Sequence, residues 1–343
     1  MKIFQKPFIR VIAGFLFFVI LTFGIRISRS GSTEAPDYPC SSNSSALANV
    51  VLEIPIGATG SQVADILFNG GVTKSSLVYF RLAVSDENSK KVAPGAHRLN
   101  QKICAKDALK QLLDPDLIPN LIKITEGAWQ SEIRSSLITS GFKAIDVDSA
   151  FTQIKLPKGF SKAEGLLFPA QYSFSTEVSA LEAIQSMIDR FSRDSAAKAL
   201  LTSSGKYSPA QLLIIASLIQ AEGDTKDFPK ISRVIRNRLE ISMPLQLDST
   251  VHYIKKVRGQ IFLSTDSTLI KSPFNTYKHY GLPPSPIGNP GSKAIDAALN
   301  PVDGDWLFFI TVAPGDTRFT RSNDEFLKWK IVYEKNRKAG AFK

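Results

Sequence analysis

The sequence contains few of the side chains that bind metal ions. Its 343 residues include two cysteines and three histidines. Cys40 and Cys104 form no Cys-x-x-Cys pair, and His97, His252 and His279 are scattered, so no cluster has the spacing of a zinc site. We therefore expect no metal and no cofactor.

Other absences narrow the class of protein further. The formal net charge is +11, which would suit nucleic acid, anionic lipid or an acidic polymer. No zinc-finger spacing and no basic stripe interleaved with aromatic residues accompanies this charge, so we expect no nucleic-acid partner. Two Ser-x-x-Lys matches, Ser195 to Lys198 and Ser203 to Lys206, lack the Ser-Asp-Asn and Lys-Thr-Gly partners of a serine acyl enzyme. We interpret both as chance matches.

One long hydrophobic run lies near the N-terminus. Residues 8–25 would span about 27 Å as a helix, close to the hydrocarbon thickness of a bilayer. Lys2 and Lys6 precede it, Arg10 lies in its first turn with an uncharged run from Val11 to Ile25 after it, and no small-x-small cleavage site separates it from Arg26. We predict a retained single-pass anchor in the cell membrane rather than a cleaved signal peptide. Its N-terminus should be cytoplasmic and the rest of the chain extracytoplasmic.

Composition and pattern divide the chain into four parts. We expect a cytoplasmic tail and transmembrane anchor at residues 1–29, a Ser-rich linker at 30–48, a small unit at 49–118 and a larger mixed α/β unit at 119–343. The fold class is α+β, because strands and helices occur without regular alternation. A disulfide between the two cysteines is permitted outside the cytoplasm, but the sequence does not show whether they are close.

The sequence of the small unit predicts the order strand, helix, helix, strand. Alternation of Leu52, Ile54 and Ile56 predicts the first strand. Helices follow at "SQVADILFNGG", with Ser61 as its cap, and at "SSLVYFRLAV", and "PGAHRL" begins the second strand. A further helix is expected at "CAKDALKQLLDP". This order is the topology of a LysM-like module, and any other small α+β unit remains the alternative.

The larger unit mixes helices with short strands. Leu181, Ile184, Ile188 and Phe191 share one face of a predicted helix. We expect helices at residues 131–141, 180–191, 209–222, 228–240 and 292–301, and strands at 121–127, 245–254 and 306–313.

The stretch "LLIIASLIQAEGDTKDFP", residues 212–229, places a carboxylate at the end of an apolar helix. Leu212, Ile215, Ile219 and Glu222 fall on one face at helical spacing. Partial burial and the unpaired carbonyls of the helix end would both raise the pKa of Glu222, as a general acid at neutral pH requires. The alternative is a solvated carboxylate in a frayed last turn.

Four further stretches carry a resemblance to a known family. "EGLLFPAQY", "ISRVIRNRLEISMPLQLDSTVHY", "FNTYKHYGLPPSPIGNPGSKAIDAALNP" and "WLFFITVAPGDTRFT", together with the helix ending at Glu222, resemble in order and spacing the YceG-like family of endolytic murein transglycosylases. The sequence departs from the family pattern at Gln220, where a first glutamate is usual, and at Ala170, where aspartate is usual. Histidines common near the family's C-terminal strand are also absent, so we assign no catalytic role there.

The resemblance implies a lyase whose catalytic domain is residues 119–343. Such an enzyme cleaves the β-1,4 bond between N-acetylmuramic acid and N-acetylglucosamine within nascent glycan strands and leaves a 1,6-anhydro end. The matching position makes Glu222 the general acid and then the base. The implied substrate is peptidoglycan, and the implied role is to set strand length during wall synthesis. Peptidoglycan synthases remain open as protein partners.

Substrate contacts are expected from residues in the matching stretches. On the predicted strand at 245–254, alternation would place Gln246, Asp248 and Thr250 on one side, facing the sugar or water. The other candidates are Asn237, which could equally brace a loop, and Asn275, Thr276 and Tyr277. Two rival functions remain open: an anchored glycan-binding module without catalysis, and a hydrolytic muramidase in which Asp248 is the second carboxylate.

Overall fold

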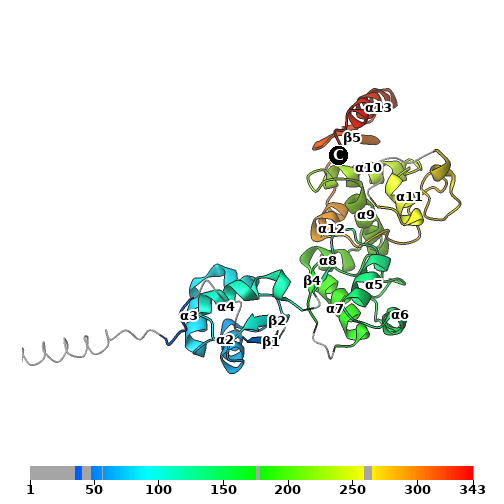
Figure 1. Cartoon of the computed structure of the whole chain (residues 1–343). Helices are drawn as coiled ribbons and strands as arrows, with labels where there is room; N and C mark the ends of the chain where they lie inside the picture. Colours follow the sequence, from blue (N-terminus) through cyan, green and yellow to red (C-terminus); the bar gives the residue numbers. More distant parts are fainter. Residues whose placement is uncertain are drawn as a thin grey trace, which may run out of the picture. The chain divides into compact units, whose positions relative to one another are not determined.

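The structure is a computed structural model that describes residues 35–40, 48–55, 57–119, 121–174, 178–258 and 265–342. The chain divides into two compact units, Met1–Pro119 and Asn120–Lys343, which follow one another along the colour bar of Figure 1. The predicted anchor at residues 8–25 lies outside the described residues. Within the described part, no helix is both long and apolar enough to span a membrane.

The first unit has the predicted element order. It comprises β1 (Asn49–Ile54), α2 (Gly60–Asn69), α3 (Ser76–Ser85), the 3₁₀ turn Glu87–Lys91, β2 (Gly95–Asn100), α4 (Ala105–Leu112) and a second 3₁₀ turn, Pro115–Leu117. β1 and β2 pair antiparallel along their full length. The helices cover this two-stranded sheet through a core that includes Leu67, Tyr79, Leu99 and Leu112.

The cap of α2 differs from the prediction. Thr59, not Ser61, is the N-cap, because its side chain accepts a hydrogen bond from the backbone N–H of Gln62. The Gln62 side chain in turn accepts from the backbone N–H of Thr59 at 2.8 Å, which closes a capping box. The helix therefore begins at Gly60, two residues earlier than a Ser61 cap would place it.

A short N-terminal segment is fastened to the first unit. Cys40 and Cys104 form a disulfide, which settles the pairing that the sequence left open. The Asp37 carboxylate also accepts a hydrogen bond from the backbone N–H of Ala105 at 3.2 Å. Ser75 donates its hydroxyl to the carbonyl oxygen of Pro36 at 2.9 Å. Residues 35–40 are thus held against the starts of both α3 and α4.

The second unit is predominantly helical, with two small antiparallel sheets in its described part. Its elements in order are β3 (Ile122–Lys123), α5 (Gln130–Thr139), α6 (Ala144–Gln153), β4 (Gln171–Tyr172), α7 (Ala180–Arg193), α8 (Ser195–Leu201), α9 (Pro209–Glu222), α10 (Phe228–Glu240), α11 (Asp248–Lys255), the 3₁₀ turn Thr265–Leu269, α12 (Ser292–Leu299), β5 (Phe308–Ala313), β6 (Asp316–Thr320) and α13 (Asn323–Lys338). β3 pairs with β4, and β5 pairs with β6. The predicted strand at 121–127 shortens to the two residues of β3.

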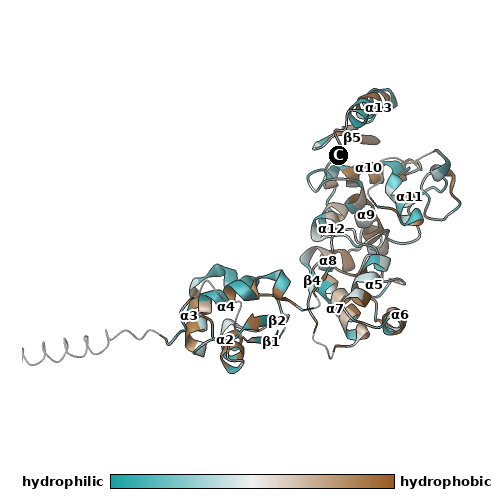
Figure 2. Cartoon of the chain, in the orientation of Figure 1, coloured by the Kyte–Doolittle hydropathy of each residue, from teal (hydrophilic) through white to brown (hydrophobic). Residues whose placement is uncertain are grey.

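The core of this unit is built around α9. Ser208 caps the helix and Pro209 occupies its first turn, as predicted. Every residue from Leu212 to Ile219 is buried, so the helix is enclosed on all sides rather than on the single predicted face. It packs against α8, α10, α11 and α12. By contrast, α13 buries none of its residues, and hydrophilic residues predominate along it in Figure 2.

The predicted strand at 245–254 is wrong, because most of this segment forms α11. Leu247 is the extended N-cap, and Gln246 before it has a positive φ of 48°. The buried residues Leu247, Thr250 and Val251 follow helical spacing, which the β-branched side chains and the alternating polar residues obscured. Gln246, Asp248 and Thr250 therefore do not share one side: Thr250 is fully buried, whereas Gln246 is exposed.

Polar side chains of α10 hold the segment that leads into β5. The Arg233 side chain donates to the carbonyl oxygen of Val302 at 2.6 Å, and Arg236 donates to that of Ala298. The next two residues of α10, Asn237 and Arg238, donate to the carbonyls of Trp306 and Leu307, just before β5. These bonds satisfy a carbonyl in the last turn of α12 and carbonyls of the irregular segment that follows it, and they fix where β5, β6 and α13 sit against the rest of the second unit.

Candidate active site

Glu222 is the last residue of α9 and lies where the chain leaves the core. The next residue, Gly223, has an extended backbone with φ of −167°. A Cβ atom at this position would lie 2.4 Å from Cδ1 of Ile231. A larger residue here would have to displace the end of the buried Ile231 side chain, so glycine favours the close packing of α10 after α9 ends. This turn leaves the Glu222 side chain partly buried at the edge of a cleft.

The cleft has a volume of about 550 Å³. Glu222, α10 and the start of α11 form one wall, and β5 and α13 form the other. Its lining comprises Glu222, Arg238, Gln246, Leu247, Asp248, Tyr277, Phe308, Phe309, Ile310, Thr311, Asn323, Phe326, Lys330, Tyr333 and Phe342. Polar groups thus gather beside Glu222, while aromatic residues dominate the facing wall. This combination is typical of carbohydrate-binding clefts, where sugar rings offer both hydroxyls and apolar faces.

Opposing influences act on the Glu222 carboxyl. Burial, which disfavours the charged form, and the negative charge of Asp248 raise its pKa to about 7. Ser249, through both its side chain and its backbone, and the charge of Arg238 act in the other direction. The Ser249 backbone N–H donates to Oε1 of Glu222 at 3.3 Å. The carboxyl is therefore close to half-protonated at neutral pH, which suits a group that gives and later takes a proton.

Three of the predicted contact residues line the cleft with Glu222: Gln246, Asp248 and Tyr277. The Tyr277 hydroxyl donates a hydrogen bond to Oδ1 of Asp248. Burial and this contact hold the pKa of Tyr277 far above its ordinary value, so the phenol stays protonated as a donor. The pair forms a polar edge beside the acid, with Gln246 exposed next to it.

The buried threonines among the candidates support the loop instead of lining the cleft. The Thr276 hydroxyl accepts a hydrogen bond from the backbone N–H of Leu247 at 2.9 Å and lies 3.0 Å from the hydroxyl of Thr250. The Thr276 carbonyl accepts from the backbone N–H of Gln246 at 3.1 Å. These bonds hold Gln246 in its left-handed conformation and set the start of α11.

The two asparagine candidates also bond to the backbone. Asn275 is fully buried, and its amide donates to the carbonyls of Thr268 and Ile270 at 2.9 and 2.8 Å. Its side-chain oxygen accepts from the backbone N–H of Tyr277, which places that tyrosine. Asn237 donates to the carbonyls at 304 and 306, at 3.1 and 2.9 Å. It therefore braces a loop, the alternative that the sequence analysis left open.

Arg238 is the cleft residue that the sequence analysis missed. Its guanidinium is buried and donates to the carbonyl oxygens of Leu307 at 2.6 Å and Leu245 at 2.5 Å. It therefore ties β5 to the loop before α11, and its charge also acts on Glu222. A signal was present, because Arg238 follows the buried Ile231 and Ile235 at helical spacing.

A second buried carboxyl, Glu164, lies outside the cleft lining. Its Oε1 accepts hydrogen bonds from the backbone N–H of Gln130 at 2.9 Å and from the amide of Asn289 at 3.2 Å. Its Oε2 accepts from the hydroxyl of Tyr253 at 3.0 Å. Burial outweighs these bonds and raises its pKa to about 7. Glu164 thus joins α5, α11 and the loop before α12.

The two residues that depart from the family pattern, Gln220 and Ala170, both take part in hydrogen bonds that hold neighbouring backbone. Gln220 accepts a hydrogen bond from the backbone N–H of Gly291 at 3.0 Å, so its side chain holds the start of α12. The carbonyl oxygen of Ala170 accepts from the backbone N–H of Ile124 at 2.9 Å, next to the β3–β4 pair.

Comparison with known proteins agrees with this architecture. Residues 52–330 match the YceG-like family, and the chain belongs to it. It is 33% identical over 307 residues to a Bacillus subtilis protein named endolytic murein transglycosylase, covering 83% of this chain and 84% of that protein. A Streptococcus pneumoniae protein of the same name is 28% identical over 313 residues, which are 80% of this chain and 57% of that protein.

A solved structure of a related protein has a similar fold. The crystal structure of a putative YceG-like protein from Listeria monocytogenes aligns with a TM-score of 0.56 at 26% identity. The alignment covers 82% of this chain and 98% of the Listeria chain.

Replacement of Glu164 by glutamine should change how stability depends on pH. The pKa of Glu164 rises from 4.5 when unfolded to about 7 when folded, so the native state binds more protons than the unfolded state between these values. Stability should therefore fall as pH rises through this window, by at most about 3 kcal/mol from this group. Glu164→Gln removes the ionisation, so chemical denaturation should show a smaller loss between pH 5 and pH 8.

The control is Glu334→Gln, at an exposed glutamate of α13. It should keep the wild-type dependence on pH. An unchanged dependence in Glu164→Gln would mean that Glu164 is already ionised in the folded protein at pH 5.

Proposed function

We propose that this chain is an endolytic lytic transglycosylase of bacterial peptidoglycan. The observation that carries the proposal is a partly buried carboxyl of pKa about 7 that lines an aromatic cleft, in a member of the YceG-like family. The similarity to the Bacillus subtilis enzyme supports it over most of both chains. The substrate is the murein glycan strand, and the reaction cleaves its β-1,4 bond between N-acetylmuramic acid and N-acetylglucosamine.

Glu222 acts twice in this mechanism. Its protonated form gives a proton to the glycosidic oxygen as an oxocarbenium-like state develops at C1 of the muramic acid. The 6-hydroxyl of the same sugar attacks C1, and the Glu222 carboxylate accepts the proton that this hydroxyl loses. The product carries a 1,6-anhydro ring, and the acid is restored. Because the nucleophile is intramolecular, one carboxyl is sufficient.

The rest of the cleft supports these two steps. After the first step Glu222 is a carboxylate, and it stays one until the second step. The buried Arg238 and the backbone N–H of Ser249 stabilise this anion. Gln246 and the Asp248–Tyr277 pair bind hydroxyl and acetamide groups of the sugar. The aromatic wall from β5 and α13 packs on the apolar faces of the rings. Repeated cleavage within nascent strands would set their length during wall synthesis, beside peptidoglycan synthases.

A hydrolytic muramidase is the main rival, with Asp248 as second carboxylate. In that mechanism Asp248 would act as a nucleophile or activate water. Asp248 instead accepts a hydrogen bond from the hydroxyl of Tyr277, and its charge raises the pKa of Glu222. These contacts suit a residue that keeps the acid protonated more than one that must attack C1.

Glu222→Gln should reduce cleavage of purified glycan strands by at least about 10²–10⁴-fold, because the amide cannot donate an acidic proton. Stability should hardly change, since a neutral amide replaces a carboxyl that is half-neutral already. The measurement is mass spectrometry of released muropeptides, in which the wild type should give 1,6-anhydro ends.

Asp224→Asn is the matched control, at an exposed carboxylate two residues away. It should keep wild-type turnover. Retention of a tenth of the activity by Glu222→Gln would remove Glu222 from the mechanism. Reducing ends that carry oxygen-18 from labelled water would instead establish the muramidase.

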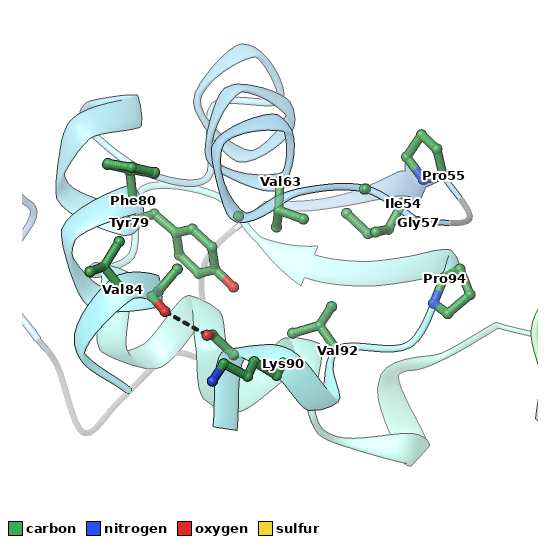
Figure 3. Close-up of a pocket in the computed structure, with 14 residues that line it drawn as sticks. Ile54, Pro55, Gly57, Val63, Tyr79, Phe80, Val84, Lys90, Val92 and Pro94 are labelled. Carbon is green, nitrogen blue, oxygen red and sulfur yellow. Dashed lines mark hydrogen bonds between the residues drawn. The ribbon is translucent and has the colours of Figure 1, made fainter. Parts of the chain in front are cut away.

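The first unit serves as a LysM-like glycan-binding module. Figure 3 shows its pocket, with a volume of about 460 Å³, between the loop after β1, helix α3 and the segment before β2. Tyr79 points its hydroxyl into this pocket, and it has no hydrogen-bond partner among the described residues. Burial raises the pKa of Tyr79 to about 12, so it remains a donor. Phe80 and Val84 are exposed where they line the same pocket.

These features fit an N-acetylated sugar. The acetamide carbonyl can accept from Tyr79, and the apolar ring face can pack on Phe80. Tyr79→Phe removes only the hydroxyl, and Phe80→Ala removes the apolar contact, so each should weaken binding to insoluble murein several-fold in a sedimentation assay. Leu77→Ala is the control, because Leu77 is equally exposed on α3 but lies outside the pocket lining. Equal binding of murein by all three variants would show that this pocket is not the glycan-binding site.

The chain is held in the cell membrane by residues 8–25, with everything from Val51 onward outside the cytoplasm. The hydrophobic run and its basic N-terminal flank support this placement. The Cys40–Cys104 disulfide supports it as well, since such bonds persist in oxidising compartments.

Protease added to intact spheroplasts should therefore digest the C-terminal part of the membrane-bound chain. Both cysteines should resist alkylation until the protein is denatured and reduced. Protection of the C-terminal part in intact cells, with its digestion after lysis, would place the enzyme in the cytoplasm.

A further inference from the structure

Ser249 presents two donors to Glu222. Both act to lower the pKa of the carboxyl, but only the backbone N–H reaches hydrogen-bond geometry with it in the structure. The backbone N–H of Ser249, in the first turn of α11, donates to Oε1 of Glu222 at 3.3 Å. Ser249 is 8% exposed, and its hydroxyl is buried and reaches hydrogen-bond geometry with none of the described residues. Buried hydroxyls are seldom left unpaired, because losing water without gaining a partner costs free energy. This hydroxyl therefore needs an explanation.

We propose that Ser249 is a positioning residue for Glu222, whose hydroxyl donates to the carboxylate only after the acid has released its proton. This rests on the catalytic role proposed for Glu222. A neutral carboxyl accepts fewer hydrogen bonds than a carboxylate, which has about four lone-pair sites. The Ser249 hydroxyl therefore makes no hydrogen bond to Glu222 while the carboxyl is protonated, and it donates one when the carboxyl is ionised. Its own proton stays on Ser249 throughout, while the transferred proton passes from Glu222 to the glycosidic oxygen and returns from the 6-hydroxyl.

The start of α11 is rigid enough for this role. Thr250 donates its hydroxyl to the carbonyl of Leu247 at 2.7 Å, and Thr276 accepts the N–H of Leu247 at 2.9 Å. Both threonine side chains are buried. Ser249 thus sits on a turn that is fixed from both sides, so its donors are in place before the charge develops.

Other charges around Glu222 come from several elements. Arg238 on α10 favours the carboxylate, and Asp248 on α11 disfavours it. Lys330 and Tyr333 on α13 and Tyr277 on the loop before α12 line the same cleft. The Arg238 guanidinium donates to the carbonyls of Leu245 and Leu307 rather than to Glu222, whereas Ser249 already donates its backbone N–H to the carboxyl.

The test compares Ser249→Ala and Ser249→Thr with the wild type in the full chain. Carbon-13 labelling of glutamate side chains gives the titration of Glu222, whose resonance is identified by its loss in Glu222→Gln. Ser249→Ala should raise the titration midpoint by about one pH unit, because the ionised form loses a donor. The alkaline limb of the cleavage rate should move upward by the same amount. Ser249→Thr keeps the hydroxyl and should restore both.

Thr225→Ala is the control, since this exposed residue lies three positions after Glu222, and it should leave the midpoint unchanged. A Ser249→Ala midpoint within about 0.2 units of wild type, or below it, would overturn the proposal whatever the rate. The titration does not depend on catalysis. If Glu222→Gln remains active, the proposed function fails while the Ser249 titration still decides whether the two groups are coupled.

Discussion

The candidate site depends on the buried guanidinium of Arg238. It donates to the carbonyl oxygens of Leu307, at the start of β5, and Leu245, in the loop before α11. These two segments belong to opposite walls of the cleft, so one side chain sets their separation. A buried arginine is costly unless its donors are satisfied, and here carbonyls left free by irregular backbone satisfy them. Without this contact, β5 and α13 would lose a main attachment to the core.

The charge of the same guanidinium also lowers the pKa of Glu222 and so offsets the effect of burial. Burial and Asp248 favour the neutral form of Glu222, whereas Arg238 and Ser249 favour the anion. A reaction with one carboxyl as both acid and base needs neither form to dominate, because each must be reached during the cycle. The close packing at Gly223 contributes to this balance, since it lets α10 return beside the end of α9 and bring Arg238 near the carboxyl.

Local rules predicted much of the fold. The N-cap at Ser208, the apolar run of α9 and the strand and helix order of the first unit follow from short-range spacing. The site was predicted less completely. The segment from Gln246 to Tyr253 satisfied both strand and helix patterns, and contacts with Thr276 decided between them. The roles of Asn237, Asn275 and Arg238 depend on carbonyls distant in sequence, which no local pattern encodes.

The buried Glu164 and the partly buried Glu222 have the same raised pKa, about 7, yet their surroundings differ in kind. Glu164 receives hydrogen bonds from Gln130, Asn289 and Tyr253, so its oxygens are occupied and it lies outside the cleft lining. Glu222 receives a single long bond and lines the cleft. A perturbed pKa marks a functional candidate, but a structural carboxyl can show the same shift. What distinguishes Glu222 is that its carboxyl lines the cleft and accepts one long hydrogen bond, as the proposed exchange of a proton with a bound sugar requires.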